Sequence, residues 1–120
     1  HRNEVRIMPY ISTRTNVEIS AEKEKRLKSM LGEAIGSFPG KTEAWLMTEF
    51  QDRCRLWFAG SDAPAAFAEV KVLGGVKREH CEKMTACLCK IFESELGIPA
   101  DRVYVKYEPV ENWGWNGSDF

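Results

Sequence analysis

Apolar side chains recur at helical spacing in two stretches of the chain, residues 21–35 and residues 78–96. In the first stretch the apolar positions form one stripe along a helix: Leu27, Met30, Leu31, Ala34 and Ile35. The second stretch has a similar stripe, made of Cys81, Met84, Leu88, Ile91, Phe92 and Leu96. Ser20 precedes the first stretch as a helix cap, and Gly97 and Pro99 follow the second as a stop signal. The pattern therefore predicts two helices that each bury one face.

Shorter runs, rich in β-branched and aromatic residues, lie before and after each predicted helix. Four of these runs are typical of strands, at residues 10–15, 44–50, 67–73 and 102–107. A fifth run, residues 55–58, has the length of a short hairpin strand. Turns that contain glycine or proline separate the elements. Residues 113–120 are an aromatic tail interrupted by glycines.

The order strand, helix, strand occurs twice, so each half of the chain is predicted to be a βαβ unit of about 60 residues. Parallel strands within each half require a right-handed crossover. We therefore expect an α+β fold, in which a four-stranded mixed sheet carries both helices on one face. We also expect its other face to be apolar and covered by further subunits, because the strands contain Phe67, Val70, Val72, Val103 and Val105.

Length and charge exclude several classes of protein. A chain of 120 residues is enough for one domain, and 43% apolar residues are enough for a core. The formal net charge of -1 gives no basic excess, so nucleic acid is not an expected partner. No apolar run approaches the ~20 residues of a membrane span. No secretory signal peptide is recognisable, which favours the cytoplasm.

The four cysteines do not form a metal or redox motif. None of them belongs to a C-x-x-C pair, and Cys87 and Cys89 would point to different sides of a helix. With only two histidines in the chain, the spacing typical of zinc ligands is missing. We therefore expect no metal site, and we interpret the cysteines as small apolar side chains in a reducing compartment.

A series of short motifs resembles the macrophage migration inhibitory factor family of the tautomerase superfamily. The resemblance extends from Pro9 to Phe120, with matching intervals between the motifs. The motifs are Met8-Pro9, Thr15-Asn16-Val17, Gly40-Lys41, Phe58-Ala59-Gly60-Ser61-Asp62-Ala63-Pro64, Leu73-Gly74-Gly75, Asp101-Arg102-Val103-Tyr104-Val105 and Gly114-Trp115-Asn116-Gly117-Ser118-Asp119-Phe120.

The resemblance implies a homotrimer whose sheets enclose a central channel, with active sites at the subunit interfaces. It implies a tautomerase that needs no cofactor and interconverts the keto and enol forms of aromatic α-keto acids such as phenylpyruvate. The alternative that it leaves open is a signalling protein, since some family members act outside cells as cytokines on a cell-surface receptor. Members of the family can leave cells without a signal peptide.

Each functional residue is carried over from the family by its position. Pro9 matches the amino-terminal proline that serves as the general base, Lys41 matches the pocket lysine, and Tyr104 matches a hydroxyl donor from a neighbouring subunit. The resemblance also implies a substrate-binding set of Tyr10, Trp45, Leu73, Lys106, Trp113, Trp115 and Phe120. Lys106 departs from the asparagine of well-known members, and the bulky Trp45 is expected to narrow the pocket mouth. The C-x-x-C of some relatives is replaced by residues 65–68, so thiol redox chemistry is not expected.

The residues before Pro9 decide whether this chemistry is available. While Met8 is attached, the nitrogen of Pro9 is an amide whose lone pair is delocalised, and it has no basicity. We expect residues 1–8 to be an extension and residues 9–120 to be the single domain. Two interpretations of the extension stay open: it was left by an expression tag, or it belongs to the natural protein.

Overall fold

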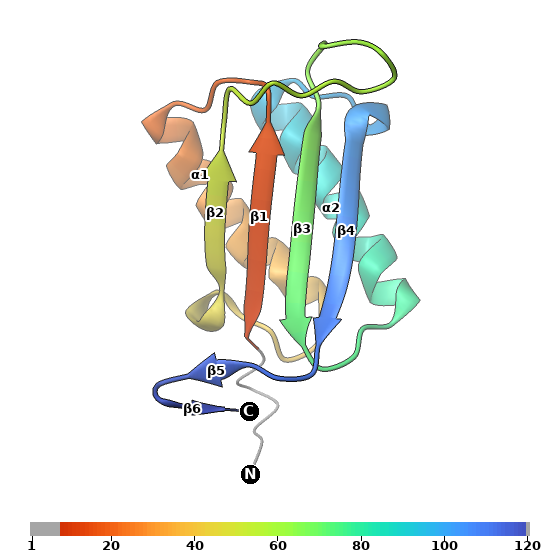
Figure 1. The fold of residues 1–120 in the computed structure, drawn as a ribbon. Helices are drawn as coiled ribbons and strands as arrows, with labels where there is room; N and C mark the ends of the chain where they lie inside the picture. The colour runs from red at the N-terminus through yellow and green to blue at the C-terminus, as the bar shows by residue number, and fades with distance from the viewer. Residues whose placement is uncertain (1–7, 120) are drawn as a thin grey trace.

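The computed structural model describes residues 8–119 (Figure 1). Two helices, six strands and three short 3-10 turns make up the ordered elements of this region. In chain order they are β1 (Pro9–Thr15), α1 (Ala21–Ala34), η2 (Ile35–Ser37), η3 (Glu43–Trp45), β2 (Met47–Gln51), β3 (Ala66–Leu73), α2 (Arg78–Leu96), η4 (Ala100–Arg102), β4 (Val103–Val110), β5 (Gly114–Trp115) and β6 (Ser118–Asp119).

The four long strands form one mixed sheet in the order β2-β1-β3-β4. Strand β1 is parallel to β2, β3 is parallel to β4, and the two inner strands β1 and β3 are antiparallel. Both helices lie behind the sheet in Figure 1, on one face of it. The predicted pair of βαβ units, the mixed sheet and the α+β class are therefore confirmed.

The ends of both helices follow from local sequence. The Ser20 side chain accepts a hydrogen bond of 3.2 Å from the Lys23 amide, which satisfies a free N–H in the first turn of α1. Gly97 ends α2 in the left-handed conformation at φ 67°, where a residue without Cβ is not strained. The last predicted residue of the first helix, Ile35, belongs to the 3-10 turn η2.

The hydrophobic core lies between the sheet and the helix layer. Its largest fully buried side chains include Phe92 from α2, Leu31 from α1 and Ile11 from β1. Val70 and Val72 of β3 are also completely buried there. Within the described residues, neither helix is both long and apolar enough to cross a membrane.

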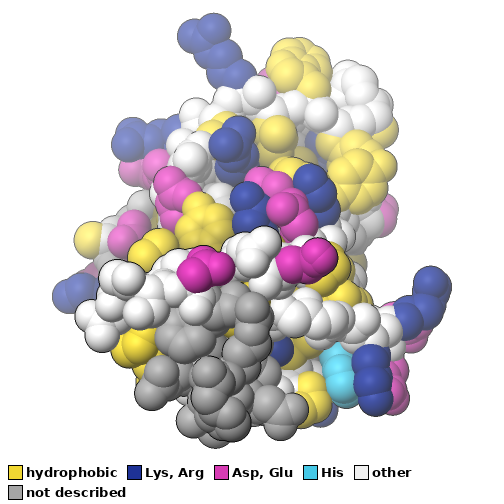
Figure 2. Space-filling model, turned by 60° about the horizontal axis from the view of Figure 1, so that its bottom comes forward, with side chains coloured by type: hydrophobic (Ala, Val, Ile, Leu, Met, Phe, Trp, Pro, Cys, Tyr) yellow, Lys and Arg dark blue, Asp and Glu magenta, His cyan; other side chains and the backbone are white. Residues whose placement is uncertain are grey.

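The face of the sheet away from the helices, here called the open face, is not apolar as we expected. Side chains alternate along a strand, so Val70 and Val72 face the helices, and Val103 and Val105 pack against the same core. Of the five predicted residues only Phe67 lies on the open face. Charged side chains occupy much of the rest: Arg14, Glu49, Glu69, Lys71, Lys106 and Glu108. Basic and acidic groups lie side by side there (Figure 2), so apolarity of this face gives no reason to expect further subunits.

Two predicted strands were wrong in detail. Residues 44 and 45 belong to the 3-10 turn η3, and β2 begins only at Met47. Residues 55–58 form no strand, and only Phe58 makes an isolated bridge, to Ser61 across a tight turn. Conversely, the tail forms the small β5–β6 hairpin around Asn116-Gly117. Both turn residues have positive φ, which this dipeptide tolerates.

Candidate active site

Five of the predicted site residues line one cavity at the lower end of the sheet in Figure 1, here called the Pro9 cavity. Its volume is about 670 Å³, within the range of small-molecule sites. The five are Pro9, Tyr10, Trp45, Trp113 and Trp115. Met8, Ala44, Leu46, Met47 and Gly114 complete the described part of the wall. The cavity is therefore mainly apolar and aromatic.

Three separate segments supply the aromatic part of this wall. Trp45 comes from the η3 turn before β2, and Trp115 comes from the tail hairpin. Their rings meet edge to face, with 5.0 Å between centroids and an angle of 81° between planes. Edge-to-face contact is a favourable arrangement of aromatic rings. This contact packs the tail against the segment before β2 and fixes two large rings in the cavity wall.

Pro9 is the first residue of β1 and is buried. Its register partner on β3 is Val72, so the ring is anchored at the end of the central strand pair. Met8 lines the same cavity and is only 3% exposed. In this chain the Pro9 nitrogen is thus an amide nitrogen, and the residue that acylates it occupies part of the cavity wall.

Lys41 is buried, with 6% of its surface exposed, but it is not among the wall residues of the Pro9 cavity. Its ammonium lies 5.7 Å from the centroid of the Phe38 ring. No carboxylate within residues 8–119 forms an ion pair with it. Burial disfavours the charged form and lowers the pKa of Lys41 from its usual value. An anionic ligand beside this ammonium would be stabilising.

Leu73 lies near Pro9 along the sheet without lining the cavity. It is the last residue of β3 and follows Val72, the register partner of Pro9. The next amide, that of Gly74, donates to the carbonyl of Val110 at 3.0 Å. The predicted substrate-binding position therefore lies at the same end of the sheet as the Pro9 cavity.

Tyr104 and Lys106 lie on β4, away from Pro9. Tyr104 is in register with Phe67, five residues along β3 from the partner of Pro9, which corresponds to about 17 Å. Tyr104 is 62% exposed and lines a second, smaller hollow of about 240 Å³. The Lys106 ammonium is 3.8 Å from a carboxylate oxygen of Glu69 and 3.8 Å from one of Glu108. One subunit therefore does not bring these two residues to the cavity. The last predicted residue, Phe120, lies outside the described part of the chain.

A polar pair next to the Pro9 cavity was missed from the sequence. The Tyr10 hydroxyl donates a hydrogen bond to the Glu49 carboxylate, and the Lys71 ammonium lies 5.8 Å from the Tyr10 ring centroid. The hydrogen bond raises the pKa of Tyr10 and lowers the pKa of Glu49. Residue spacing alone does not reveal this pair, because it depends on the register of β1 with β2.

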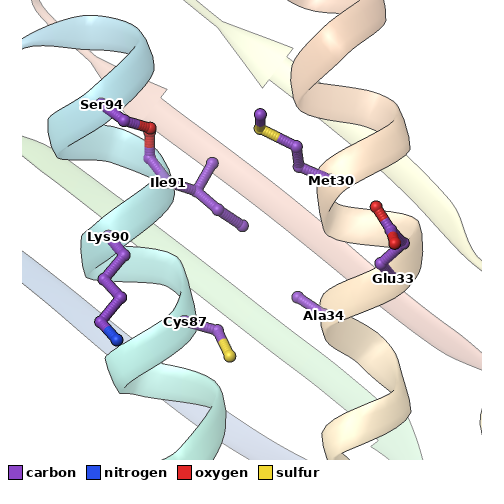
Figure 3. A pocket seen from close by; sticks show the side chains of 7 residues that line it. All are labelled: Met30, Glu33, Ala34, Cys87, Lys90, Ile91 and Ser94. Atoms are coloured by element: carbon purple, nitrogen blue, oxygen red, sulfur yellow. The ribbon is translucent and has the colours of Figure 1, made fainter.

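Another hollow, of about 480 Å³, lies between the two helices (Figure 3). Met30 and Ala34 of α1 face Cys87 and Ile91 of α2 across it. None of the predicted site residues lines this groove. Within the described residues, no group of three or more His, Cys, Asp or Glu side chains is arranged to hold a metal ion. The Pro9 cavity is therefore the better candidate for chemistry.

Comparison with known proteins gives a consistent result. A family model described as macrophage migration inhibitory factor matches residues 8–120. A macrophage migration inhibitory factor homolog from Trichuris trichiura is 33% identical over 115 residues, covering 94% of this chain and 100% of the relative. Macrophage migration inhibitory factor from Xenopus laevis is 30% identical, with coverage of 94% and 99%.

Solved structures agree in fold. A crystal structure of MIF2 from Leishmania major has a TM-score of 0.88 and 34% identity, covering 94% of this chain and 97% of that one. A macrophage migration inhibitory factor homologue from Prochlorococcus marinus has a TM-score of 0.78 and 34% identity, with coverage of 92% and 98%.

Proposed function

Because the chain belongs to the macrophage migration inhibitory factor family, we propose that it is an isomerase that interconverts the keto and enol forms of aromatic α-keto acids. Phenylpyruvate represents this substrate class. The main support for the proposal is the Pro9 cavity, in which the first residue of β1 is a proline that lies among three tryptophans and a tyrosine. An apolar cleft with aromatic walls suits the ring of such a substrate.

In the proposed reaction, Pro9 acts as the general base after the bond to Met8 has been cleaved. Its secondary amine removes a proton from the carbon next to the substrate carbonyl. The electron pair of that C–H bond forms the C=C bond of the enol, and the π electrons of the carbonyl move to its oxygen. That oxygen takes up a proton from water, and the Pro9 ammonium returns its proton to water. An α-amino group usually titrates near pH ~8. Burial at the start of β1 would lower the pKa of this amine toward neutrality, where a base is most effective.

Lys41 and Tyr104 are assigned the charged and polar ends of the substrate. The buried Lys41 ammonium has no carboxylate partner in the described chain, so a substrate carboxylate would compensate its desolvation. The Tyr104 hydroxyl would donate to the oxygen that becomes negative as the enol forms. Leu73 would offer its backbone N–H, and Lys106 would add positive charge. The roles given to Leu73 and Lys106 are part of the same proposal.

The distance between Pro9 and Tyr104 supports assembly into a homotrimer. Since about 17 Å of strand separates them in one subunit, a complete site needs Tyr104 from a neighbouring copy. Strands β2 and β4 are both sheet edges in the single subunit, with backbone groups free to pair with another chain. The charged open face of the sheet suits the wall of a water-filled channel between subunits.

The experiment compares three proteins: the chain cut to begin at Pro9, the full chain, and the cut chain with Pro9→Gly. Mass spectrometry verifies each terminus, and circular dichroism verifies the fold. Phenylpyruvate enolisation should be about 10²–10⁴-fold faster with the free proline than with the full chain, the range typical of a general base. Equal rates in all three proteins would exclude Pro9 as the base.

A second candidate is a signalling protein that binds a cell-surface receptor without catalysis. The buried Met8 favours it, because a chain that keeps this residue has no free amine in the cavity. Receptor binding by the full chain that survives Trp115→Ala would support this function. Secretion without a signal peptide belongs to this second proposal, whereas the isomerase is proposed for the cytoplasm.

A further inference from the structure

The loop before β3 has little secondary structure but is tightly held. Its tight turn joins Phe58 to Ser61 through two backbone hydrogen bonds of 2.9 and 3.0 Å. Ala59 and Gly60 at the tip have φ of 54° and 76°, which closes the turn over two residues. The rest of the loop, up to Pro64, lies next to the start of β4.

Arg102, two residues before Tyr104, is hydrogen-bonded to this loop. Its guanidinium donates to four backbone carbonyls: Phe58 at 3.2 Å, Ser61 at 3.0 Å, Ala63 at 3.0 Å and Pro64 at 2.9 Å. Two of these carbonyls also close the tight turn. Within residues 8–119 no carboxylate pairs with Arg102. Its positive charge therefore faces the backbone carbonyls of the loop.

The loop in turn holds the ring of Tyr104. The Arg102 guanidinium carbon lies 5.3 Å from the centroid of the Phe58 ring. That ring contacts the Tyr104 ring, with 4.8 Å between centroids and an angle of 52°. Pairing of β4 with Phe67 of β3 fixes the backbone of Tyr104, but not the rotation of its side chain. Because the Tyr104 ring is 62% exposed, its contact with Phe58 limits where the hydroxyl points.

We propose that Arg102 is a positioning residue, which aims the Tyr104 hydroxyl through the Phe58 ring. This inference rests on the proposed isomerase function, in which Tyr104 enters the Pro9 cavity of a neighbouring copy. Arg102 does not touch the substrate in this arrangement. A lysine would keep the positive charge, but its single ammonium lacks the planar fork that reaches four carbonyls at once. Arg102→Lys therefore disrupts this set of hydrogen bonds without removing the charge.

The first test follows the tyrosine ring itself, independently of activity. The full chain contains three tyrosines, so 3-fluorotyrosine labelling gives three ¹⁹F resonances that single Tyr→Phe variants assign. Arg102→Lys should shift or broaden the Tyr104 resonance and leave that of Tyr107 unchanged, because Tyr107 is held separately by Thr85 and Cys81. The matched control is Arg78→Lys, at an arginine whose side chain is 91% exposed. An unchanged Tyr104 resonance in Arg102→Lys overturns the proposal.

The second test uses a double-mutant cycle in the chain that begins at Pro9. Arg102→Lys should lower kcat by about tenfold to a hundredfold, the cost of a misplaced catalytic group. In a Tyr104→Phe background the same substitution should change kcat by less than about twofold. An equal loss in both backgrounds would mean that Arg102 is merely structural. If the parent protein is inactive, the isomerase proposal fails on that result, while the ¹⁹F spectrum still decides whether Arg102 orders Tyr104.

Discussion

The two ends of the sheet are built in different ways and carry different halves of the proposed chemistry. At one end, the Pro9 cavity is walled by apolar and aromatic side chains from β1, the η3 turn and the tail. At the other end, hydrogen bonds from Asn16 and Arg102 to backbone carbonyls hold the loop beside Tyr104. The first end offers a cavity with a candidate base, and the second offers an exposed phenol. Neither end alone holds all the groups of the proposed active site.

The two ends of the sheet place different demands on their side chains. A cavity that receives an apolar ring needs rigid apolar walls, and contacts such as that between Trp45 and Trp115 supply them. A side chain that is delivered to another molecule must instead stay exposed while its backbone is fixed. Hydrogen bonds from Arg102 to the neighbouring loop provide that order without burying Tyr104. If the two ends work as a pair, damage to either one should abolish the same activity.

The largest expected effect comes from mixing two defective subunits. One keeps Met8 and so has an acylated Pro9, and the other has a free Pro9 but carries Tyr104→Phe. Each alone should be strongly impaired, the tyrosine variant by about 10²–10³-fold. After unfolding and refolding together in equal amounts, about a quarter of the interfaces in a cyclic trimer should combine both intact groups. Phenylpyruvate enolisation should rise accordingly.

The control for this experiment is each variant refolded alone. A mixture no more active than the average of the two controls would show that Pro9 and Tyr104 are not shared between copies. Mass spectrometry under native conditions would verify that the refolded species contains both subunits.

A smaller effect is expected from the hydrogen bonds that hold the Tyr104 end. The Asn16 amide donates to the carbonyls of Asp62 and Ala63, and its oxygen accepts from the Ala65 amide at 2.9 Å. Ala65 is 1% exposed, so Asn16→Ala leaves a buried N–H without this partner. We expect the free energy of unfolding to fall by about 1–3 kcal/mol in urea titrations.

The matched control is Asn112→Ala, at an exposed asparagine in the tail. Its unfolding free energy should stay within about 0.5 kcal/mol of the parent value. A similar loss in both variants would contradict a special role for Asn16 in the loop.

The sequence predicted the helices well, because their stripes, the Ser20 cap and the Gly97 stop are local signals. It predicted the sheet less well at its ends. Ala44 and Trp45 were predicted as the start of a strand, because aromatic residues are common in strands, but they form the 3-10 turn η3, which is closed by local backbone hydrogen bonds. The prediction of an apolar open face was wrong because side chains alternate along β3 and β4, and this alternation turns the predicted valines of both strands toward the core.

The candidate site could be predicted only through the family resemblance. A proline at the start of a strand is usually structural, and nothing in the spacing of Pro9, Trp45 and Trp115 shows that they meet. The Tyr10–Glu49 pair had no signal, because its register becomes visible only in the folded sheet. That Tyr104 lies at the far end of the sheet also follows from topology, not from local sequence.

A third prediction concerns Lys41, whose burial lowers its pKa below the usual 10.5. The unfolded chain then binds this proton more tightly than the folded chain does. Between the folded pKa and pH 10.5, stability should therefore rise with pH as this penalty disappears. In Lys41→Met that rise should be absent, and the protein should be more stable than the parent at neutral pH. Urea titrations across this pH range measure both effects. A rise that persists in Lys41→Met would assign it to another group.

The smallest effect is expected at the polar pair beside the Pro9 cavity, Tyr10 and Glu49. The Tyr10 hydroxyl stabilises the charged form of Glu49 and lowers the pKa of that carboxylate from the usual 4.5. Any stability that Glu49 contributes is present above its unfolded pKa and is lost as the pH falls through its lower folded pKa. In Tyr10→Phe the pKa of Glu49 should return toward 4.5, as measured by the ¹³C shift of its carboxyl group during titration. Tyr107→Phe, which removes a hydroxyl bonded elsewhere, should leave the Glu49 titration unchanged. If both variants titrate like the parent, the Tyr10 hydroxyl does not lower the pKa of Glu49. The two ends of the sheet then differ in their apolar walls and loop contacts, and not in this polar pair.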